Sequence, residues 1–403
     1  MPALVPPDRP PPFTDPVTYR KDYLPELDGL RAVAVLLVLW AHLPLAIQPD
    51  WMTRAGGFLS HSYLGVDLFF VLSGFLITRI LLVDRDAGVP VRHFLARRFL
   101  RIFPIYYLLL GILAALGALG LYRLEPALPW AAVYLGNYYV FQWAYPNAYG
   151  LLDHTWSLCV EEHFYLLWPP LAAWLAPRHS RRILLAVFLP LSLATGIYLS
   201  WQLGAFEQRD ALSKATASAS TARFGSLSAG ALLAFAEPAL RASRSRALWL
   251  ALFLAVPAWL TSQGGVVKTG AFQVVLWSGM TGDAMRVLPT LQLVSFPLTS
   301  ACILVLLIGF TGSSAPHAVL LRLVPLRWIG RISYGLYLYH YPLYFAFGIK
   351  HPDHPEPSMT RLGLGLAGVF AVAWVSWWLI ERPLVRLADR FRGSKRPSDV
   401  EPA

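Results

Sequence analysis

The sequence has 403 residues, of which 56% are hydrophobic and 14% are charged, and its formal net charge is +11. An average soluble domain carries about 25% charged residues, so this composition excludes an ordinary soluble protein and indicates an integral membrane protein. The basic surplus alone would suit a nucleic-acid partner, but the lysines and arginines follow a membrane topology, so we expect none. Both cysteines, Cys159 and Cys302, lie in apolar stretches, which predicts neither a disulfide framework nor a metal site.

The order of apolar and polar segments predicts an all-α, polytopic fold. Residues 1–22 are Pro-rich and polar, as expected of a disordered cytoplasmic lead-in. We expect one transmembrane domain over 23–387 and a basic, disordered tail over 388–403. Within the domain, about ten stretches are apolar and long enough to span a bilayer as helices. They lie near 27–47, 63–83, 101–121, 151–176, 182–201, 222–239, 246–262, 289–311, 331–349 and 360–381.

The basic residues give this topology an orientation. If the N-terminus is cytoplasmic, most of the 34 lysines and arginines fall in inner loops and the tail, as the positive-inside rule requires. Both termini are therefore predicted to be cytoplasmic, in a multi-pass protein of the inner membrane. The aromatic segment 128–145 would reverse every later loop if it spanned the bilayer, so we interpret it as re-entrant or interfacial.

The first apolar stretch contains two ionisable residues, Arg31 and His42. An eleven-residue step turns a helix about 20° past three full turns, so both residues share one face, roughly 16 Å apart along the axis. Ionisable groups inside a bilayer are costly and usually face a cavity or a partner, which favours a functional pair. The alternative is an arginine that extends to the interface and a histidine hydrogen-bonded within the bundle.

The second stretch places Asp67 near its outer end. One interpretation is that the carboxylate has a partner in the bundle, and the other is that it caps the helix start near Gly65. Ser73 and Gly74 follow about two turns later, where small residues allow another helix to approach closely.

Four arginines crowd the cytoplasmic start of the third stretch, more than the topology requires. Guanidinium groups form bidentate hydrogen bonds with phosphate, so a cytosolic ligand such as a coenzyme A or a nucleotide is one natural partner. Anionic lipid headgroups are the other. The four are Arg92, Arg97, Arg98 and Arg101.

The segment HTWSLCVEEHFYLLWP, residues 154–169, holds Glu161, Glu162 and His163 in a row. Consecutive positions differ by about 100° on a helix, so at least one glutamate should face the bundle. Such a carboxylate would orient a histidine or accept a proton, or it would form a salt bridge with an intramembrane arginine. For His154 and Ser157, near the helix start, the simplest role is capping.

Near the C-terminus, His340 lies in a tyrosine-rich stretch, RISYGLYLYHYPLYF. We expect it to be structural or to line the substrate site. Glu381 and Arg382 are expected to close the last helix, because Pro383 should block its continuation.

Taken together, these segments resemble the acyltransferase 3 family of membrane O-acyltransferases. Six motifs occur in order over nearly the whole chain: LDGLRA with the spacing of Arg31 and His42, GVDLFFVLSGFLI, RRFLRIFP, HTWSLCVEEHFYLLWP, ISYGLYLYHYPL and IERPL. The resemblance implies about ten membrane helices and transfer of acyl groups from cytosolic acyl-coenzyme A to hydroxyls of lipid-linked or surface glycans. It also implies that Arg31 and His42 are essential.

This resemblance leads to expected roles for individual residues. We expect His42 to act as the general base, with Asp67, Glu161 or Glu162 orienting its imidazole. Acyl-coenzyme A, with acetyl as the acyl group, is the expected donor, and no permanently bound cofactor is expected. The remaining assignments are Arg31, Arg97, Arg98 and Arg101 for the coenzyme phosphates, and Trp156, Ser157, Tyr165 and His340 for the substrate lining.

Several alternatives stay open at this point. The acceptor is a glycan, a lipid-linked saccharide or a small molecule such as a macrolide, and transfer is direct or passes through an acyl-histidine. Some family members carry a C-terminal esterase-like domain, whereas this sequence ends shortly after Glu381, so we expect a separate protein for any such step. A different class, a transporter or flippase, would use Arg31, His42, Asp67 and Glu161 to line a substrate or proton path.

Overall fold

The computed structural model describes residues 23–44, 63–121, 126–142, 150–204, 219–263, 284–349 and 358–391. Within these ranges the chain is all-α and contains no strand, which confirms the predicted fold class. The predicted lead-in at 1–22 and residues 392–403 of the predicted tail lie outside the described residues.

Each of the ten predicted apolar stretches coincides with a helix or a run of helices. These are α1 (Pro25–Ala41), α3 (Tyr63–Asp86), α4 (Val91–Ala118), α7 (Trp156–Trp174), α8 (Pro177–Ile183) with η4 (Leu184–Phe188) and α9 (Leu189–Gly204), α11 (Ser220–Ala242), α12 (Arg244–Gln263), α14 (Ala284–Phe310), α17 (Ser333–Ala346), and α18 (Met359–Ser376) with η6 (Trp377–Glu381) and α19 (Arg382–Ala388). Four helical runs in the described part are long and apolar enough to cross a membrane: Leu64–Asp86, Val91–Ala118, Pro177–Leu199 and Met359–Phe391.

Shorter helices connect these long ones. They are α5 (Leu128–Ala132), α6 (Gly136–Gln142), η3 (Asp153–Thr155), α15 (Pro316–Leu321), α16 (Val324–Arg331) and η7 (Asp389–Phe391). The segment predicted to be re-entrant contains α5 and α6, which are separated by Tyr134 with a positive φ of 56°. As far as Gln142 it therefore has no continuous helix long enough to span a bilayer.

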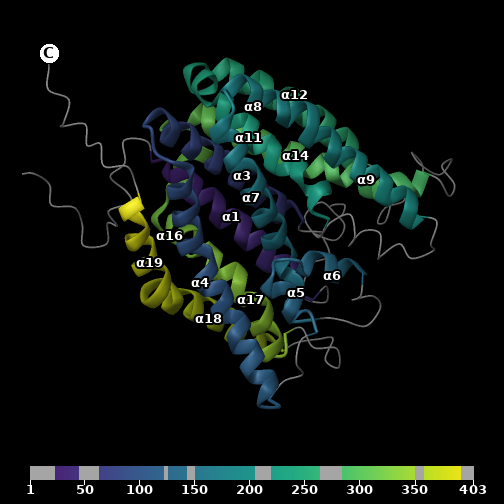
Figure 1. The fold of residues 1–403 in the computed structure, drawn as a ribbon, viewed down its shortest axis with the longest axis vertical. Coiled ribbons are helices and arrows are strands. Elements are labelled where there is room, and N and C mark those ends of the chain that lie inside the picture. The colour runs from purple at the N-terminus through teal and green to yellow at the C-terminus, as the bar shows by residue number, and fades with distance from the viewer. Residues whose placement is uncertain are drawn as a thin grey trace, which may run out of the picture.

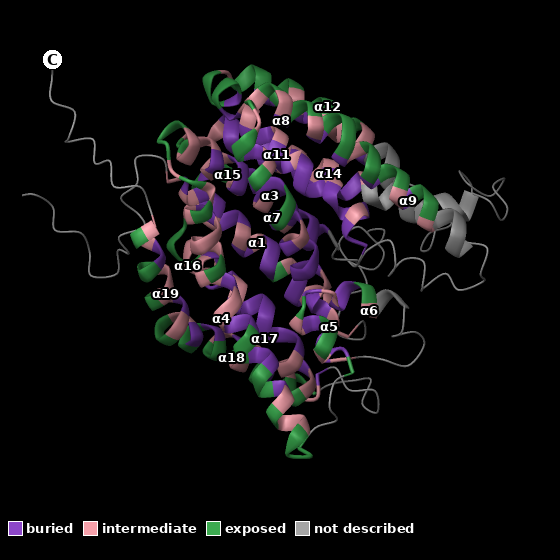
Figure 2. Cartoon of the chain, viewed as in Figure 1, coloured by how far each residue is buried: buried purple, intermediate pink, exposed green. Residues whose placement is uncertain are grey.

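The helices form two groups around a buried centre (Figure 1). Helices α1, α3 and α7 lie centrally, α11, α12 and α14 pack on one side, and α4, α17, α18 and α19 lie on the other. Burial is concentrated in the central helices, and green, exposed positions mark the outer surfaces (Figure 2). Many exposed side chains are large and apolar, as lipid-facing positions require, including Trp174, Trp249, Phe253 and Leu379.

Helices α3 and α11 approach each other backbone to backbone. A Cβ atom added to Gly74 would lie 1.9 Å from the carbonyl oxygen of Leu227, and one added to Gly230 would lie 1.8 Å from that of Val71. The expectation that Gly74 allows close helix packing is confirmed. This contact fixes the relative depth of the two helices that carry Asp67 and its partner, described below.

We expect Gly74→Ala to lower the stability of the protein, because the new methyl group overlaps the backbone of α11. Overpacking of this kind costs about 1–3 kcal/mol. The matched control is Gly111→Ala on α4, where a Cβ would meet open space, so this variant should match or slightly exceed the wild type. Thermal unfolding of both variants in lipid nanodiscs measures the difference, and equal melting temperatures would contradict the packing.

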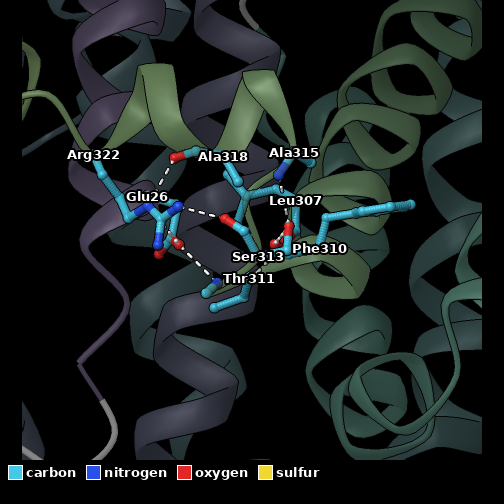
Figure 3. A network of polar contacts seen from close by, with 9 residues as sticks. Glu26, Leu307, Phe310, Thr311, Ser313, Ala315, Ala318 and Arg322 are labelled. Atoms are coloured by element: carbon cyan, nitrogen blue, oxygen red, sulfur yellow. Dashed lines mark hydrogen bonds and ion pairs between the residues drawn. The ribbon is translucent and has the colours of Figure 1, made fainter.

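A buried carboxylate fixes the start of α1 (Figure 3). Glu26 Oε1 accepts a hydrogen bond from the Gly312 backbone N–H at 2.9 Å and lies 3.7 Å from Arg322 Nε. Arg322 in turn donates to the carbonyl oxygens of Ser313 and Ala318. Because a buried charge is tolerated only when it is paired, this network anchors the end of α1 that precedes Arg31.

Two helix ends differ from the predictions. Helix α1 ends at Ala41 rather than near residue 47, and His42 is its C-cap, although its φ of −83° and ψ of −2° are still helical. The prediction that Pro383 stops the last helix is wrong. The chain turns through the π-helical η6 just before it, and Pro383 lies in the first turn of α19, where a missing N–H is tolerated.

Candidate active site

A cavity of about 510 Å³ lies between the central helices and the group that contains α4, α17 and α19. Its lining comes from α1, α3, α4, α7, α17 and the C-terminal α19 and η7, and it includes Arg31, Arg97, Arg98, Arg101, Ser157 and Glu161. The sequence therefore identified six of the residues that the fold brings to one cavity. Its volume is in the usual range of small-molecule sites.

Two of the cavity arginines, one on α1 and one on α4, differ from the others in their contacts. Neither Arg31 on α1 nor Arg101 on α4 forms a hydrogen bond or an ion pair with any residue that the structure describes. The two guanidinium groups nevertheless lie close enough to repel each other, and Arg98 adds to this repulsion. Guanidinium groups that converge on one cavity without a direct ion pair can bind an anion, although the carboxylates of Asp28 and Glu161 also line the cavity and offset part of their charge.

Arg97 and Arg98 are held in place by protein groups. Arg97 forms an ion pair with Asp84 and donates a hydrogen bond to the carbonyl oxygen of Phe391 at 2.7 Å, which ties α4 to α3 and η7. Arg98 donates to the hydroxyl of Tyr165, and its guanidinium carbon lies 4.0 Å from the centre of that ring. Tyr165, predicted to line the substrate site, is not a cavity residue. Its contacts with Arg98 instead hold the guanidinium group of that residue in place.

The inner end of the cavity is polar. The hydroxyls of Ser157 and Tyr337 lie 2.6 Å apart, and Tyr337 donates a hydrogen bond of 2.6 Å to the His154 carbonyl oxygen. Both side chains line the cavity. Sequence analysis missed Tyr337, although its spacing of three residues from His340 places the two on one face of α17.

Three histidines from distant parts of the chain meet beyond Tyr337. His42 Nδ1 lies 3.1 Å from His340 Nε2, and the ring of His154 contacts that of His340 edge-on at 5.2 Å. His42 and His340 do not line the cavity, whereas Tyr337 lines it and its ring contacts that of His340 at 5.6 Å. The predicted capping role of His154 is wrong, because Thr155 is the N-cap of α7 and makes no side-chain cap.

Asp67 forms a buried ion pair with α11. Its Oδ2 lies 2.9 Å from Arg223 Nη1, and its Oδ1 accepts a hydrogen bond from Ser226. Trp156, predicted to line the substrate site, packs its ring 5.6 Å from the Arg223 guanidinium instead. Of the two interpretations of Asp67, the partner in the bundle is confirmed and the helix cap is wrong, since Asp67 lies inside α3.

The two glutamates of α7 point to different surroundings. Glu161 faces the cavity near Arg31 and Arg98, whereas Glu162 is buried and its Oε1 has no hydrogen-bond partner among the described residues. Tyr134, whose buried hydroxyl also lacks a described partner, lies within electrostatic reach of Glu162. The prediction that at least one glutamate faces the bundle is confirmed.

The comparisons with known proteins agree with the resemblance carried by the sequence motifs. The family model described as an acyltransferase domain matches residues 24–381. The chain belongs to the acyltransferase 3 family. Helices α1, α3, α4, α7 and α17, which supply most of the cavity lining, fall within the matched range, and the cavity residues of α19 and η7 follow it.

Two similar proteins are named O-acetyltransferases. The chain is 28% identical over 392 residues to the peptidoglycan O-acetyltransferase OatA of Listeria monocytogenes, covering 94% of this chain and 58% of that protein. It is 30% identical over 388 residues to the O-acetyltransferase OatA of Staphylococcus aureus, covering 91% and 58%. The chain thus spans little more than half the length of these acyltransferase 3 relatives. No solved structure matches the chain.

Proposed function

We propose that this chain transfers an acetyl group from cytosolic acetyl-coenzyme A to a hydroxyl group of a glycan. Membership of the acyltransferase 3 family and the names of its relatives support the reaction class and the type of acceptor. The observation that carries the proposal is the pair of guanidinium groups, Arg31 and Arg101, which form no ion pair with a described residue and lie in a cavity large enough for a small-molecule donor. Phosphate groups of coenzyme A are the matching anions.

The proposal includes a topology. The domain over 23–387 forms ten membrane helices with both termini in the cytoplasm, and the protein lies in the cytoplasmic membrane. In this orientation Arg31 near the start of α1, Arg97, Arg98 and Arg101 near the start of α4, and η7 all lie on the cytoplasmic side. The cavity then opens to cytosolic acetyl-coenzyme A, and His42 lies about 16 Å deeper than Arg31.

The proposed reaction needs one base and one held donor. His42 Nε2 takes the proton of the acceptor hydroxyl while its oxygen attacks the thioester carbonyl. As the tetrahedral intermediate collapses, the carbon–sulfur bond breaks and the coenzyme thiolate takes the proton from His42. The thioester reaches His42 past Tyr337, which lines the cavity and contacts the ring of His340.

The geometry modifies the proposed role of the carboxylates. Both oxygens of Asp67 already accept hydrogen bonds from α11, so we assign Asp67 to the α3–α11 contact rather than to orienting His42. Glu161 faces the arginines and is assigned to balancing their charge in the absence of donor.

We expect Arg31→Gln and Arg101→Gln to raise the KM for acetyl-coenzyme A by about 10–100-fold each, because each removes a charge-assisted hydrogen bond to phosphate. Arg85→Gln is the control, since Arg85 is an exposed arginine of α3 outside the cavity lining and pairs with Asp86. Steady-state thiol release over a range of donor concentrations gives both constants. A KM unchanged by both cavity variants would contradict the assignment.

The acceptor is tested in cells. Mass spectrometry of surface polysaccharide and glycolipids, with and without the wild-type chain, should show an added acetyl group that depends on the protein. A transporter would instead redistribute a glycan without adding mass. Unmodified glycan in every fraction would therefore refute acetyl transfer.

A further inference from the structure

The two carbonyl groups beside the histidine pair fix where its protons lie. His340 Nδ1 lies 2.6 Å from the carbonyl oxygen of Tyr337, and His42 Nδ1 lies 3.0 Å from the carbonyl oxygen of Val38. A carbonyl oxygen only accepts hydrogen bonds, so both Nδ1 atoms must carry a proton. Neutral His340 then has its lone pair on Nε2, and neutral His42 has its lone pair on Nε2 as well.

The contact between the two rings has a direction as a result. The one proton on His42 Nδ1 is shared between two acceptors, the Val38 carbonyl oxygen at 3.0 Å and His340 Nε2 at 3.1 Å. The rings lie with their centres 4.9 Å apart. The reverse direction would require a lone pair on His42 Nδ1 to face the Val38 carbonyl oxygen, which is repulsive.

We propose that His340 is the positioning residue of the His42 base, a role that rests on the proposed function. Together with the Val38 carbonyl oxygen it accepts the Nδ1 proton and so holds His42 in the tautomer whose Nε2 is basic, the atom that takes the proton of the acceptor hydroxyl. When His42 becomes an imidazolium, the same bond becomes charge-assisted and stabilises it. The neutral imidazole of His340 thereby has the role that the aspartate carboxylate has in serine hydrolases, where it orients the catalytic histidine.

The surroundings of His340 suit this role because they hold its ring rigidly. His340 is fully buried, and its ring contacts those of Tyr337, Tyr344 and His154. His154 Nε2 donates to the carbonyl oxygen of Leu338 at 3.1 Å, and its ring stacks on Tyr341 at 5.1 Å. A base orients reproducibly only when the group behind it is locked by packing and hydrogen bonds.

Two amide substitutions distinguish the roles of the two ring nitrogens of His340. His340→Gln places an acceptor oxygen near the Nε2 position, so it should keep the bond to His42. His340→Asn places its amide near the Nδ1 position, so it should keep the bond to Tyr337 and lose the one to His42. We expect kcat to fall about 10–100-fold in His340→Asn and His340→Ala, and less than about fivefold in His340→Gln. The KM for acetyl-coenzyme A should stay within about twofold in all three.

The measurement is steady-state thiol release from acetyl-coenzyme A by the full chain in lipid nanodiscs. If folded His340→Asn keeps the wild-type kcat, or folded His340→Gln is as slow as His340→Ala, the positioning role is wrong. Full activity of His42→Ala would instead refute the proposed base, so the two failures are distinguishable.

A second measurement needs no His340 variant and stands even if these variants fail to fold. Heteronuclear NMR of wild-type protein with nitrogen-labelled histidine, assigned by the signals missing in His42→Gln, reports which ring nitrogen carries the proton. We expect it on Nδ1 of His42. A neutral His42 with the proton on Nε2 would overturn the proposal.

Discussion

His42→Ala is expected to lower acetyl transfer by at least about 100-fold, and up to about 10,000-fold, the range that general-base catalysis contributes. The KM for acetyl-coenzyme A should change little, because we propose that Arg31 and Arg101 bind the donor, and His42 does not line their cavity. The measurement is thiol release by the purified chain in nanodiscs. The loss should appear in kcat, as expected when an interaction of the transition state is removed.

The control for this variant is His317→Ala. His317 is exposed at α15, where its ring packs against Phe310. We expect wild-type kcat and KM for it. If His42→Ala released thiol as fast as His317→Ala, His42 would not be the base. That result would favour the alternative in which the intramembrane polar residues line the path of a transporter.

Asp67→Ala is expected to destabilise the protein by about 3–5 kcal/mol, because it leaves the Arg223 guanidinium charged and buried without its carboxylate. Asp67 is fully buried, and the side chain of Arg223 is only 4% exposed. Arg223→Ala should have a comparable effect, because it leaves the Asp67 carboxylate buried without its guanidinium partner. Thermal unfolding in nanodiscs measures both.

Two further variants serve as comparisons for these single substitutions: the double variant and a variant of an exposed ion pair. Asp67→Ala with Arg223→Ala removes both charges, so its destabilisation should be smaller than the sum of the two single effects. Arg85→Ala breaks the exposed pair with Asp86 and should cost no more than about 1 kcal/mol. Additive effects at Asp67 and Arg223, or an Asp67→Ala variant as stable as the wild type, would contradict a buried ion pair.

Local sequence pattern was enough to predict the helices and several cavity residues. Apolar stretches of bilayer length place each long helix, and the costs of burying charge point to Arg31, His42 and the arginines of α4. Arg31, Arg97, Arg98 and Arg101 converge on one cavity because α1 packs against α3 and α4 packs against α19, whereas His42 lies outside that cavity.

Partners that are distant in sequence could not be predicted in this way. Arg223 lies 156 residues from Asp67, and His340 lies 298 residues from His42, so no spacing rule connects them. Carboxylates were therefore the obvious candidates to orient His42, whereas the fold supplies an imidazole and a backbone carbonyl. The end of α18 was mispredicted because a π-helical turn, which composition does not reveal, accommodates Pro383.

The central claim is that the chain moves acetyl from acetyl-coenzyme A to a glycan. It is tested most directly by counting label in isolated cell-wall glycan after incubation with radiolabelled acetyl-coenzyme A and the purified wild-type chain in nanodiscs. We predict that label accumulates in the glycan with time, saturates with donor concentration and is released by mild alkali, as an O-acetyl ester is. Glycan that contains no more label than a protein-free incubation would contradict the claim.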